Sequence, residues 1–157
     1  MYHLRPAVPS DSDFLADVTL TATRAQGRLA PDFDETSWRE GFAEWTLESV
    51  DDPATDLYVV EVDDRAAGRL RVSRTPQAVE LNGIQLHPDV QNRGIGTAII
   101  NALQNEATQL GVPLQLSVER DNPSARRLYD RLGFTKTGES GAEDVLQWTK
   151  GVEQNRL

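Results

Sequence analysis

The stretch HPDVQNRGIGTAII, residues 87–100, places Pro88, Gly94 and Gly96 between an apolar run typical of a strand and one typical of a helix. Glycine loses more conformational entropy on folding than other residues, so two glycines one residue apart indicate a backbone path that a side chain would obstruct. A strand that enters such a turn and then a helix presents backbone N–H groups and the positive end of the helix dipole. This arrangement is typical of an anion site, most often one for phosphate.

Two common glycine-loop chemistries fit this turn poorly. A Walker loop ends in Gly-Lys-Ser/Thr, and GIGTAI has no lysine. A dinucleotide fingerprint needs glycine or alanine where this chain has Ile99, and a ribose-binding acid about 20 residues further on. Glu119 instead closes a predicted strand. The remaining pattern is Gln91-x-x-Gly94-x-Gly96.

Hydrophobic periodicity predicts a mixed α/β order, β–α–α–β–β–β–α–β–α–β–β. We expect Ser10 to cap the first helix, and Ser37 with Glu40 to form a capping box at the second. The expected strands are residues 2–8, 57–62, 66–74, 78–88, 113–119, 134–137 and 144–148, and the expected helices are residues 10–27, 37–49, 97–111 and 122–133. The turn at residues 63–66 predicts a hairpin between the second and third strands. The predicted apolar stripe of the third helix comprises Ala98, Ile99, Ala102, Leu103, Ala107 and Leu110.

Length and composition predict a single domain over residues 1–150 with a C-terminal tail at 151–157. The chain has no cysteine, no apolar run long enough to span a bilayer and no signal-peptide pattern, so we expect a cytoplasmic protein without membrane contact. The net charge of −9 argues against nucleic acid as a partner. Acidic residues are concentrated in residues 32–64, which indicates either a solvated surface or a region that favours a cation.

Two segments carry a resemblance to a known family. ELNGIQLHPDVQNRGIGTAI resembles the central motif of the GNAT superfamily, the Gcn5-related N-acetyltransferases, and DNPSARRLYDRLGF resembles its second motif. In the second motif the matching residues are Asn122, Ala125, Tyr129, Gly133 and Phe134. The resemblance implies a GNAT fold: a central mixed, mostly antiparallel sheet of six to seven strands, splayed between strands 4 and 5, with about four helices.

The resemblance also implies acetyl-CoA as co-substrate and no metal. Backbone N–H groups of residues 91–97 would bind the pyrophosphate of coenzyme A, and the backbone of residues 84–86 would bind its pantetheine arm. Arg126 or Arg127 would reach the 3′-phosphate, unless this helix face is simply exposed, and Asn122 would act as a helix cap, a cofactor contact or both. The implied cofactor residues are Ile84, Gln85, Leu86, Gln91, Asn92, Arg93, Gly94, Ile95, Gly96, Thr97, Asn122 and Arg126.

Three catalytic residues follow from the same resemblance. Tyr129 would protonate the departing thiolate, the Leu86 N–H would polarise the thioester carbonyl, and Glu80 would accept a proton from the amine. Glu80 is six residues before Leu86, so both side chains lie on one face of the strand. Glu119 and a chain of water molecules remain alternatives for the base, and the alternative interpretation of Glu80 is an ordinary solvent-facing strand acid.

The expected activity is acetyl transfer to a primary amine by direct attack in a ternary complex. The acceptor is a small molecule or a peptide, and an acidic, aromatic lining would suit a cationic amine. That lining would comprise Asp32, Phe33, Asp34, Glu35, Trp38 and Trp45, although Trp38, Phe42 and Trp45 at helical spacing are also typical of a core. The alternatives are a non-catalytic acyl-CoA sensor and a peptide-binding protein that uses the acidic face. A homodimer is common in the family and leaves no mark in this sequence.

Overall fold

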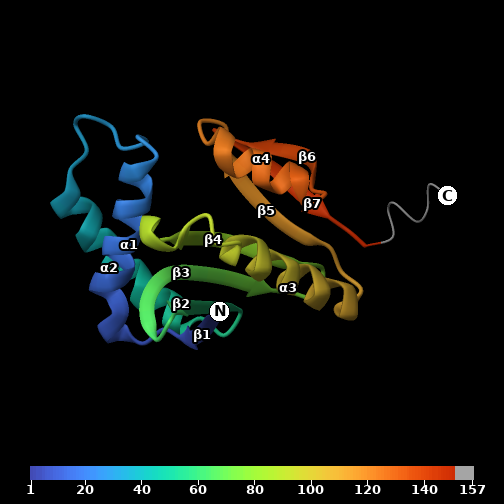
Figure 1. Ribbon diagram of the computed structural model, residues 1–157, viewed down its shortest axis with the longest axis horizontal. Helices are drawn as coiled ribbons and strands as arrows, with labels where there is room; N and C mark the ends of the chain where they lie inside the picture. Colours follow the sequence, from blue (N-terminus) through green and yellow to red (C-terminus); the bar gives the residue numbers. More distant parts are fainter. Residues whose placement is uncertain (151–157) are drawn as a thin grey trace. The chain divides into compact units, whose positions relative to one another are not determined.

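The computed structural model of the protein describes residues 1–150 (Figure 1). These residues form seven strands, four α-helices and two short 3-10 helices, in the predicted order. Along the chain they are β1 (Tyr2–Pro6), η1 (Pro9–Asp11), α1 (Ser12–Ala25), α2 (Glu35–Asp51), β2 (Thr55–Val62), β3 (Arg65–Arg74), β4 (Val79–Leu86), η2 (Pro88–Val90), α3 (Ile95–Leu110), β5 (Leu114–Glu119), α4 (Pro123–Arg131), β6 (Thr135–Ser140) and β7 (Glu143–Trp148).

The strands pair in the order β1-β2-β3-β4-β5-β7-β6. The pairs β1–β2, β5–β7 and β6–β7 are antiparallel, whereas β4 and β5 are parallel. The parallel register joins residues 79–81 to residues 114–116, at the beginning of both strands. This confirms the predicted mixed sheet, and the parallel pair agrees with the predicted splay between the fourth and fifth strands.

The chain divides into two compact units. One comprises residues 1–72 and 83–95, and the other comprises residues 73–82 and, of the described chain, residues 96–150. β3 and β4 therefore contribute residues to both units. The single domain expected over residues 1–150 stays a prediction, and the tail expected at 151–157 lies outside the described residues.

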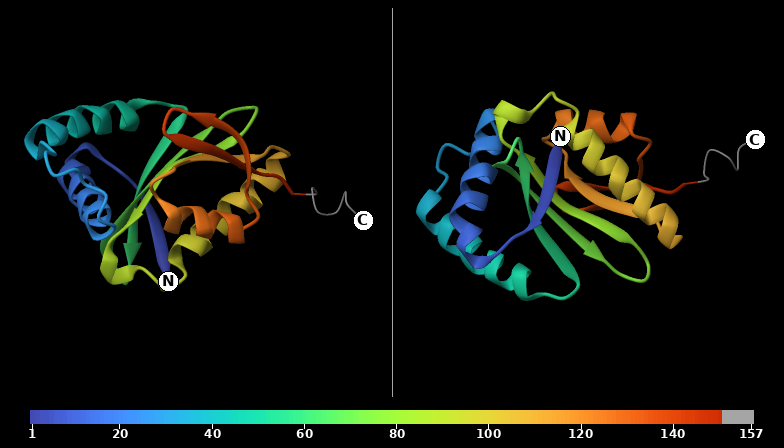
Figure 2. Two further views of the ribbon diagram at one scale, coloured as in Figure 1. Left: turned by 90° about the horizontal axis from the view of Figure 1, so that it is seen from above. Right: turned by 60° about the horizontal axis from the view of Figure 1, so that its bottom comes forward.

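In the first unit, α1 and α2 lie side by side (Figure 2). Leu15 of α1, Phe42 of α2 and Val59 of β2 belong to one apolar core, with exposed fractions of 0%, 9% and 0%. Trp38 and Trp45 are partly buried against this core. The Trp38 and Phe42 rings stack with centroids 4.8 Å apart, and Trp45 lies 5.5 Å from Phe42. The core interpretation of these aromatic residues is therefore confirmed.

Both helices of this unit begin differently from the prediction. Ser10 does not cap the first helix, because a 3-10 turn precedes α1 and the Asp11 carboxylate accepts the Val8 N–H at 2.8 Å. At α2 the N-cap is Asp34, whose carboxylate accepts the Ser37 N–H at 3.1 Å. Serine and aspartate are similarly good caps, so local propensity leaves the choice open. An ionised carboxylate interacts more favourably with the positive helix end, which favours Asp34.

The connection between β2 and β3 is a tight turn. Asp63 and Asp64 both have positive φ, 53° and 64°. Two successive residues of this kind match the twist of a two-residue hairpin loop, and aspartate tolerates the conformation better than most residues. The hairpin predicted from the sequence is confirmed.

In the second unit, α3 buries a stripe that differs in part from the predicted one. Ile99, Leu103 and Ala107 are buried as expected, whereas Ala98 and Ala102 are exposed and Leu110 is 59% exposed. Gln104 is buried instead, and its side-chain amide donates to the Leu132 carbonyl at 3.0 Å. A polar side chain is accommodated at this core position because the carbonyl at the C-terminal end of α4 accepts its hydrogen bond.

None of the helices in residues 1–150 combines the length and the apolar composition that crossing a bilayer requires.

Candidate active site

At the end of β4, the backbone N–H and C=O groups of successive residues point alternately toward β3 and away from it. The His87 N–H donates to the Ala67 carbonyl of β3 at 2.8 Å. β3 and β4 are neighbours in the sheet and only residues 75–78 join them, too short a connection for a parallel pair, so they are antiparallel. In such a pair the backbone groups of the preceding residue point the other way, so the Leu86 N–H and C=O leave β4 on the edge away from β3. The Leu86 carbonyl there accepts the Gln91 side-chain amide at 2.9 Å. Gln91 thus ties the following turn to the strand edge on which the predicted oxyanion donor, the Leu86 N–H, is found.

The turn itself combines a 3-10 helix with two residues in the left-handed region. The His87 imidazole Nδ1 accepts the Asp89 N–H at 3.1 Å and so caps η2. Asn92 and Gly94 then have φ of 63° and 78°, and α3 begins at Ile95. Alternation of this kind turns successive N–H groups into a concave nest. The first N–H groups of α3, which have no intrahelical acceptor, continue that row.

Glycine is required at position 94 because of the backbone conformation there, and not because neighbouring atoms crowd the position. A Cβ atom built on Gly94 would meet no protein atom within 4 Å, yet φ of 78° is strained for any other residue. No protein atom therefore fills the space beside Gly94 in the nest. The residues present therefore fit the pyrophosphate that the motif predicts.

The other predicted residues of this segment have varied surroundings. Ile84 and Thr97 are half-buried, Gly96 is the second residue of α3, and Ile95 is buried with 6% exposure. The exposed Arg93 guanidinium lies 3.4 Å from the Asp63 carboxylate. This ion pair links the turn to the β2–β3 hairpin.

Gln85 has a side-chain role that sequence reasoning missed. Its amide oxygen accepts Arg69 Nη1 at 2.6 Å, and Arg69 is only 5% exposed. Sequence reasoning gave Arg69 no role. Gly83 was the available signal, because a Cβ atom there would lie 2.7 Å from Arg69 Nη1.

In the second unit, Asn122 is the N-cap of α4. Its side-chain oxygen accepts the Ala125 N–H at 3.3 Å, and Pro123 occupies the first turn. The expectation that Asn122 caps this helix is confirmed. Its contact with the cofactor stays a prediction.

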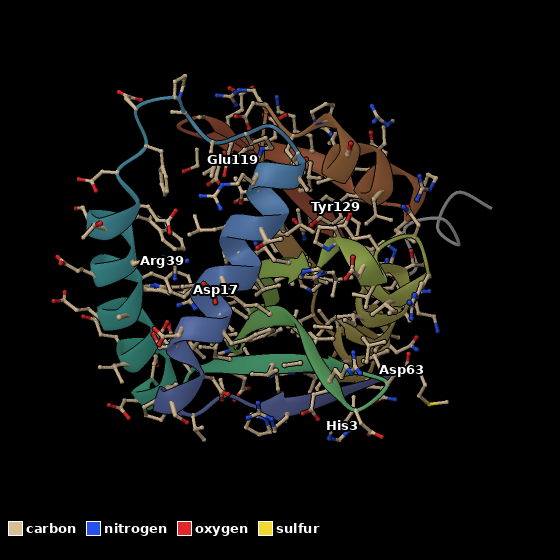
Figure 3. All side chains as sticks on the ribbon, turned by 60° about the vertical axis from the view of Figure 1, so that its left-hand side comes forward. His3, Asp17, Arg39, Asp63, Glu119 and Tyr129 are labelled. Atoms are coloured by element: carbon tan, nitrogen blue, oxygen red, sulfur yellow. The ribbon has the colours of Figure 1, made fainter. Side chains whose placement is uncertain are left out.

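Tyr129 lies on α4 with 8% exposure, and its ring packs edge-on against Phe134 at 5.6 Å between centroids. Figure 3 labels it together with Glu119 of β5. Burial raises the pKa of Tyr129 to about 12. The hydroxyl is therefore protonated at neutral pH, as a proton donor must be.

Arg126 is held by two carboxylates. Its guanidinium lies 3.1 Å from Asp130 and 2.8 Å from Asp144, and the hydrogen bond that it donates to Asp130 is the main cause of its raised pKa. Asp144, with an 8% exposed side chain, also accepts Arg120 at 3.0 Å. Arg127 is exposed and contacts the Ser124 hydroxyl at 3.3 Å. The 3′-phosphate contact of Arg126 stays a prediction.

The two candidate bases lie on β4 and β5. Glu80 is half-buried and stands opposite Gln115 in the parallel register, whereas Glu119 is exposed at the end of β5, opposite Glu143. Asn82, on the Glu80 face, donates to the Ser73 hydroxyl. The partial burial of Glu80 at the strand pair suits a base better than the exposed strand end of Glu119.

The predicted acidic lining from the first two helices has other bonding partners. Asp34 caps α2, and Glu35 accepts Arg24 at 2.8 Å and Arg39 at 2.9 Å. Arg39 also reaches Asp17 of α1 at 2.7 Å, and Figure 3 shows these two side chains on neighbouring helices. These carboxylates hold α1, α2 and the segment between them together.

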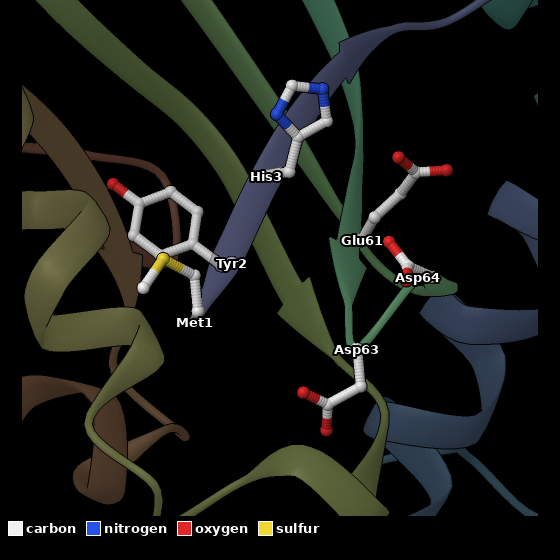
Figure 4. Close-up of a pocket in the computed structure, with 6 residues that line it drawn as sticks. All are labelled: Met1, Tyr2, His3, Glu61, Asp63 and Asp64. Atoms are coloured by element: carbon white, nitrogen blue, oxygen red, sulfur yellow. The ribbon is translucent and has the colours of Figure 1, made fainter.

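A shallow pocket of about 220 Å³ lies elsewhere in the first unit (Figure 4). Its lining is Met1, Tyr2, His3, Glu61, Asp63 and Asp64. None of these residues belongs to the predicted site. Within residues 1–150, no group of three or more His, Asp or Glu side chains is placed to hold a metal ion.

Comparison with known proteins places the chain in a family. Residues 19–134 match the model of the Acetyltransferase (GNAT) family. The chain therefore belongs to the GNAT family of acetyltransferases. An uncharacterised N-acetyltransferase of Methanocaldococcus jannaschii is 26% identical to this GNAT protein over 161 residues, which cover 98% of the chain and 67% of the relative.

Solved structures show the same fold. The PaiA N-acetyltransferase of Thermoplasma acidophilum, in complex with coenzyme A, superposes with a TM-score of 0.78 at 18% identity, covering 94% of this chain and 98% of that one. The spermidine/spermine N-acetyltransferase SpeG of Vibrio cholerae gives a TM-score of 0.67 at 20% identity, covering 99% and 97%. The predicted GNAT fold and N-acetyltransferase class are confirmed.

Proposed function

We propose that this GNAT protein transfers the acetyl group of acetyl-CoA to a primary amine, by direct attack while both substrates are bound. The observation that carries the proposal is the nest of Asn92 and Gly94, left-handed at both residues and continued by the start of α3. Coenzyme A in the Thermoplasma relative and acetyl-CoA in PseH of Campylobacter jejuni support the choice of ligand.

In this proposal the N–H groups of residues 91–97 bind the pyrophosphate and the backbone of residues 84–86 binds the pantetheine arm. The thioester supplies an activated acetyl group. The Leu86 N–H, on the strand edge away from β3, would donate to the carbonyl oxygen, where negative charge develops during attack.

Proton transfer completes the proposed reaction. The amine nitrogen forms a bond to the acetyl carbon and loses a proton to Glu80, while the carbon–sulfur bond breaks. The Tyr129 hydroxyl, protonated at neutral pH because of its raised pKa, gives a proton to the leaving sulfur. Since a thiol has a pKa near 8.5, this last step lowers the barrier only modestly.

A thermal shift with acetyl-CoA tests the binding site. A ligand at about one hundred times its Kd stabilises the folded state by about 2.7 kcal/mol, so Tm should rise by several degrees. Gly94→Ala should remove this rise, because alanine strains the nest at φ of 78° and places a methyl group in the open space.

Gly111→Ala is the matched control. Gly111 follows α3 with φ of 71° and also has no atom within 4 Å of an added Cβ. Both variants should therefore lose similar stability without ligand, about 1 kcal/mol each, and only Gly94→Ala should lose the acetyl-CoA response. A full response in Gly94→Ala, or none in the wild type, contradicts the site.

Turnover is tested by thiol release from acetyl-CoA over a panel of amines. Amine-dependent release supports the enzyme. Acetyl-CoA binding without release for any amine supports the acyl-CoA sensor instead.

A further inference from the structure

Arg69 on β3 is a buried cation to which no carboxylate of residues 1–150 is bonded. It is 5% exposed, its Nη1 donates to the neutral Gln85 amide, and its Nε has no hydrogen-bond partner within residues 1–150. Several exposed or half-buried guanidiniums in this chain bind carboxylates, such as Arg5 with Asp11 at 3.0 Å. In a chain of 25 acidic and 16 basic residues, a buried arginine without such a bond stands out.

A second cation adjoins it. Arg71, two residues along β3, donates from Nε to the Ser49 hydroxyl at 3.3 Å. The Asp52 carboxylate stabilises the charge of Arg71 by electrostatic attraction and not by a hydrogen bond. The Asp52 oxygens instead accept the Ala54 N–H and the Thr55 hydroxyl. Two neighbouring positive charges thus share an environment that carries little negative charge.

An aromatic surface of α2 holds both guanidiniums. Their central carbons lie 4.8 Å (Arg69) and 4.7 Å (Arg71) from the Trp45 ring centroid, and Arg69 lies 5.7 Å from that of Phe42. Cation–π contact stabilises a guanidinium through its face and leaves the in-plane N–H groups available. These N–H groups match the geometry of a carboxylate.

β4 makes room for this pair. A side chain at Gly83 would meet Arg69 Nη1 at 2.7 Å, and the half-exposed Gln85 supplies a neutral oxygen at 2.6 Å. Burying a charge without a partner costs stability, and an apolar side chain of similar volume is often more stabilising. A packing role alone therefore leaves the choice of arginine at position 69 without a physical reason.

We infer that the Arg69–Arg71 pair binds the carboxylate of the acceptor, so that the acceptor is an amine that also carries a carboxylate. This inference rests on the proposed function. Trp45 orients the two guanidiniums, and Gln85 holds Arg69 until a carboxylate oxygen takes its place. The amine nitrogen is the nucleophile and the carboxylate takes no part in bond making.

The test compares amino acids and short ω-amino acids with their carboxamides, and with spermidine, as acceptors in the thiol-release assay. Hydrogen bonds to a charged group contribute about 1.5–3 kcal/mol, so the carboxylates should have kcat/KM about ten- to a hundredfold above the matched carboxamides. Arg69→Met should remove this preference, raise KM for the carboxylate acceptor and leave the acetyl-CoA thermal shift unchanged.

Arg65→Met is the matched control. Arg65 is exposed on the same strand, so the variant changes net charge equally and should keep the carboxylate preference. Arg69→Met should also have a Tm at or above that of the wild type, because it removes a buried charge. A large fall in Tm with an unchanged acceptor preference would assign Arg69 to packing and overturn the inference.

Failure of this inference differs from failure of the proposed function. If carboxamides or spermidine are acetylated as well as the carboxylates, the inference is wrong and the acetyltransferase stands. If acetyl-CoA neither shifts Tm nor releases thiol with any amine, the proposed function is wrong and the inference falls with it.

Discussion

At the scale of single residues, Tyr129 joins a buried ring to a hydroxyl that burial keeps neutral, since its pKa is raised to about 12. For Tyr129→Phe we expect kcat to fall about tenfold, at the low end for a general acid, because a thiolate is already a good leaving group. The KM for acetyl-CoA should be unchanged. Steady-state thiol release measures both constants, and full activity in this variant would remove Tyr129 from the mechanism.

The same pKa predicts the pH dependence of this effect. A hydroxyl with a pKa of about 12 stays protonated throughout the range from about pH 6 to pH 9.5. The ratio of wild-type to Tyr129→Phe kcat should therefore be constant across that range. A ratio that falls toward one with an apparent pKa below about 10 would show that the hydroxyl ionises earlier, against this expectation.

At the scale of elements, the start of α2 shows how a cap is chosen. Asp34 accepts the Ser37 N–H, whereas the serine that the sequence favoured is an exposed residue of the first turn. Asp34→Ala should lower the free energy of unfolding by about 1 kcal/mol, the usual effect of losing an N-cap. Ser37→Ala should change it by less than about 0.5 kcal/mol, as for an ordinary surface substitution. Urea unfolding measures the free energy of unfolding of both variants. A larger loss in Ser37→Ala than in Asp34→Ala would show that Ser37 is the cap.

At the scale of the whole molecule, acid stability depends on carboxylates bound to arginine or lysine. Hydrogen bonds from Arg5 lower the pKa of Asp11, and hydrogen bonds from Arg120 and then Lys136 lower the pKa of Asp144. A lowered folded-state pKa means that the unfolded chain binds more protons in this range. The stability from these groups is thus present above the ordinary carboxyl pKa and is lost as pH falls below about 4.

Acid titration of stability checks this prediction. Asp144→Asn should destabilise the protein at pH 7 and reduce the further loss of stability between about pH 5 and pH 3. Asp32→Asn, at an exposed aspartate for which no side-chain hydrogen bond or ion pair is found within residues 1–150, is the control and should follow the wild type. If the two variants lose stability in parallel with acid, Asp144 does not contribute in the expected way.

The fold and much of the candidate site could be predicted because their signals are local. The apolar periodicity of α3, the Asn122-Pro123 cap and the hairpin at Asp63 depend on residues close together in the chain, and each was found. Ser37 and Leu110 were misassigned because two caps or two helix faces satisfied the local pattern equally well. For α3, burial against other elements made the choice, whereas at α2 the charge of the Asp34 carboxylate at the positive helix end did.

By itself the sequence determined the glycine turn, since a φ of 78° at Gly94 is a property of the backbone that only glycine meets without strain. It also determined the family, through two motifs read in order. Only the tertiary structure showed that Gly83 clears space for Arg69 and that Trp45 lies over two guanidiniums. These contacts join residues of β3, β4 and α2 that are far apart in sequence, and no local pattern encodes the burial of a charge.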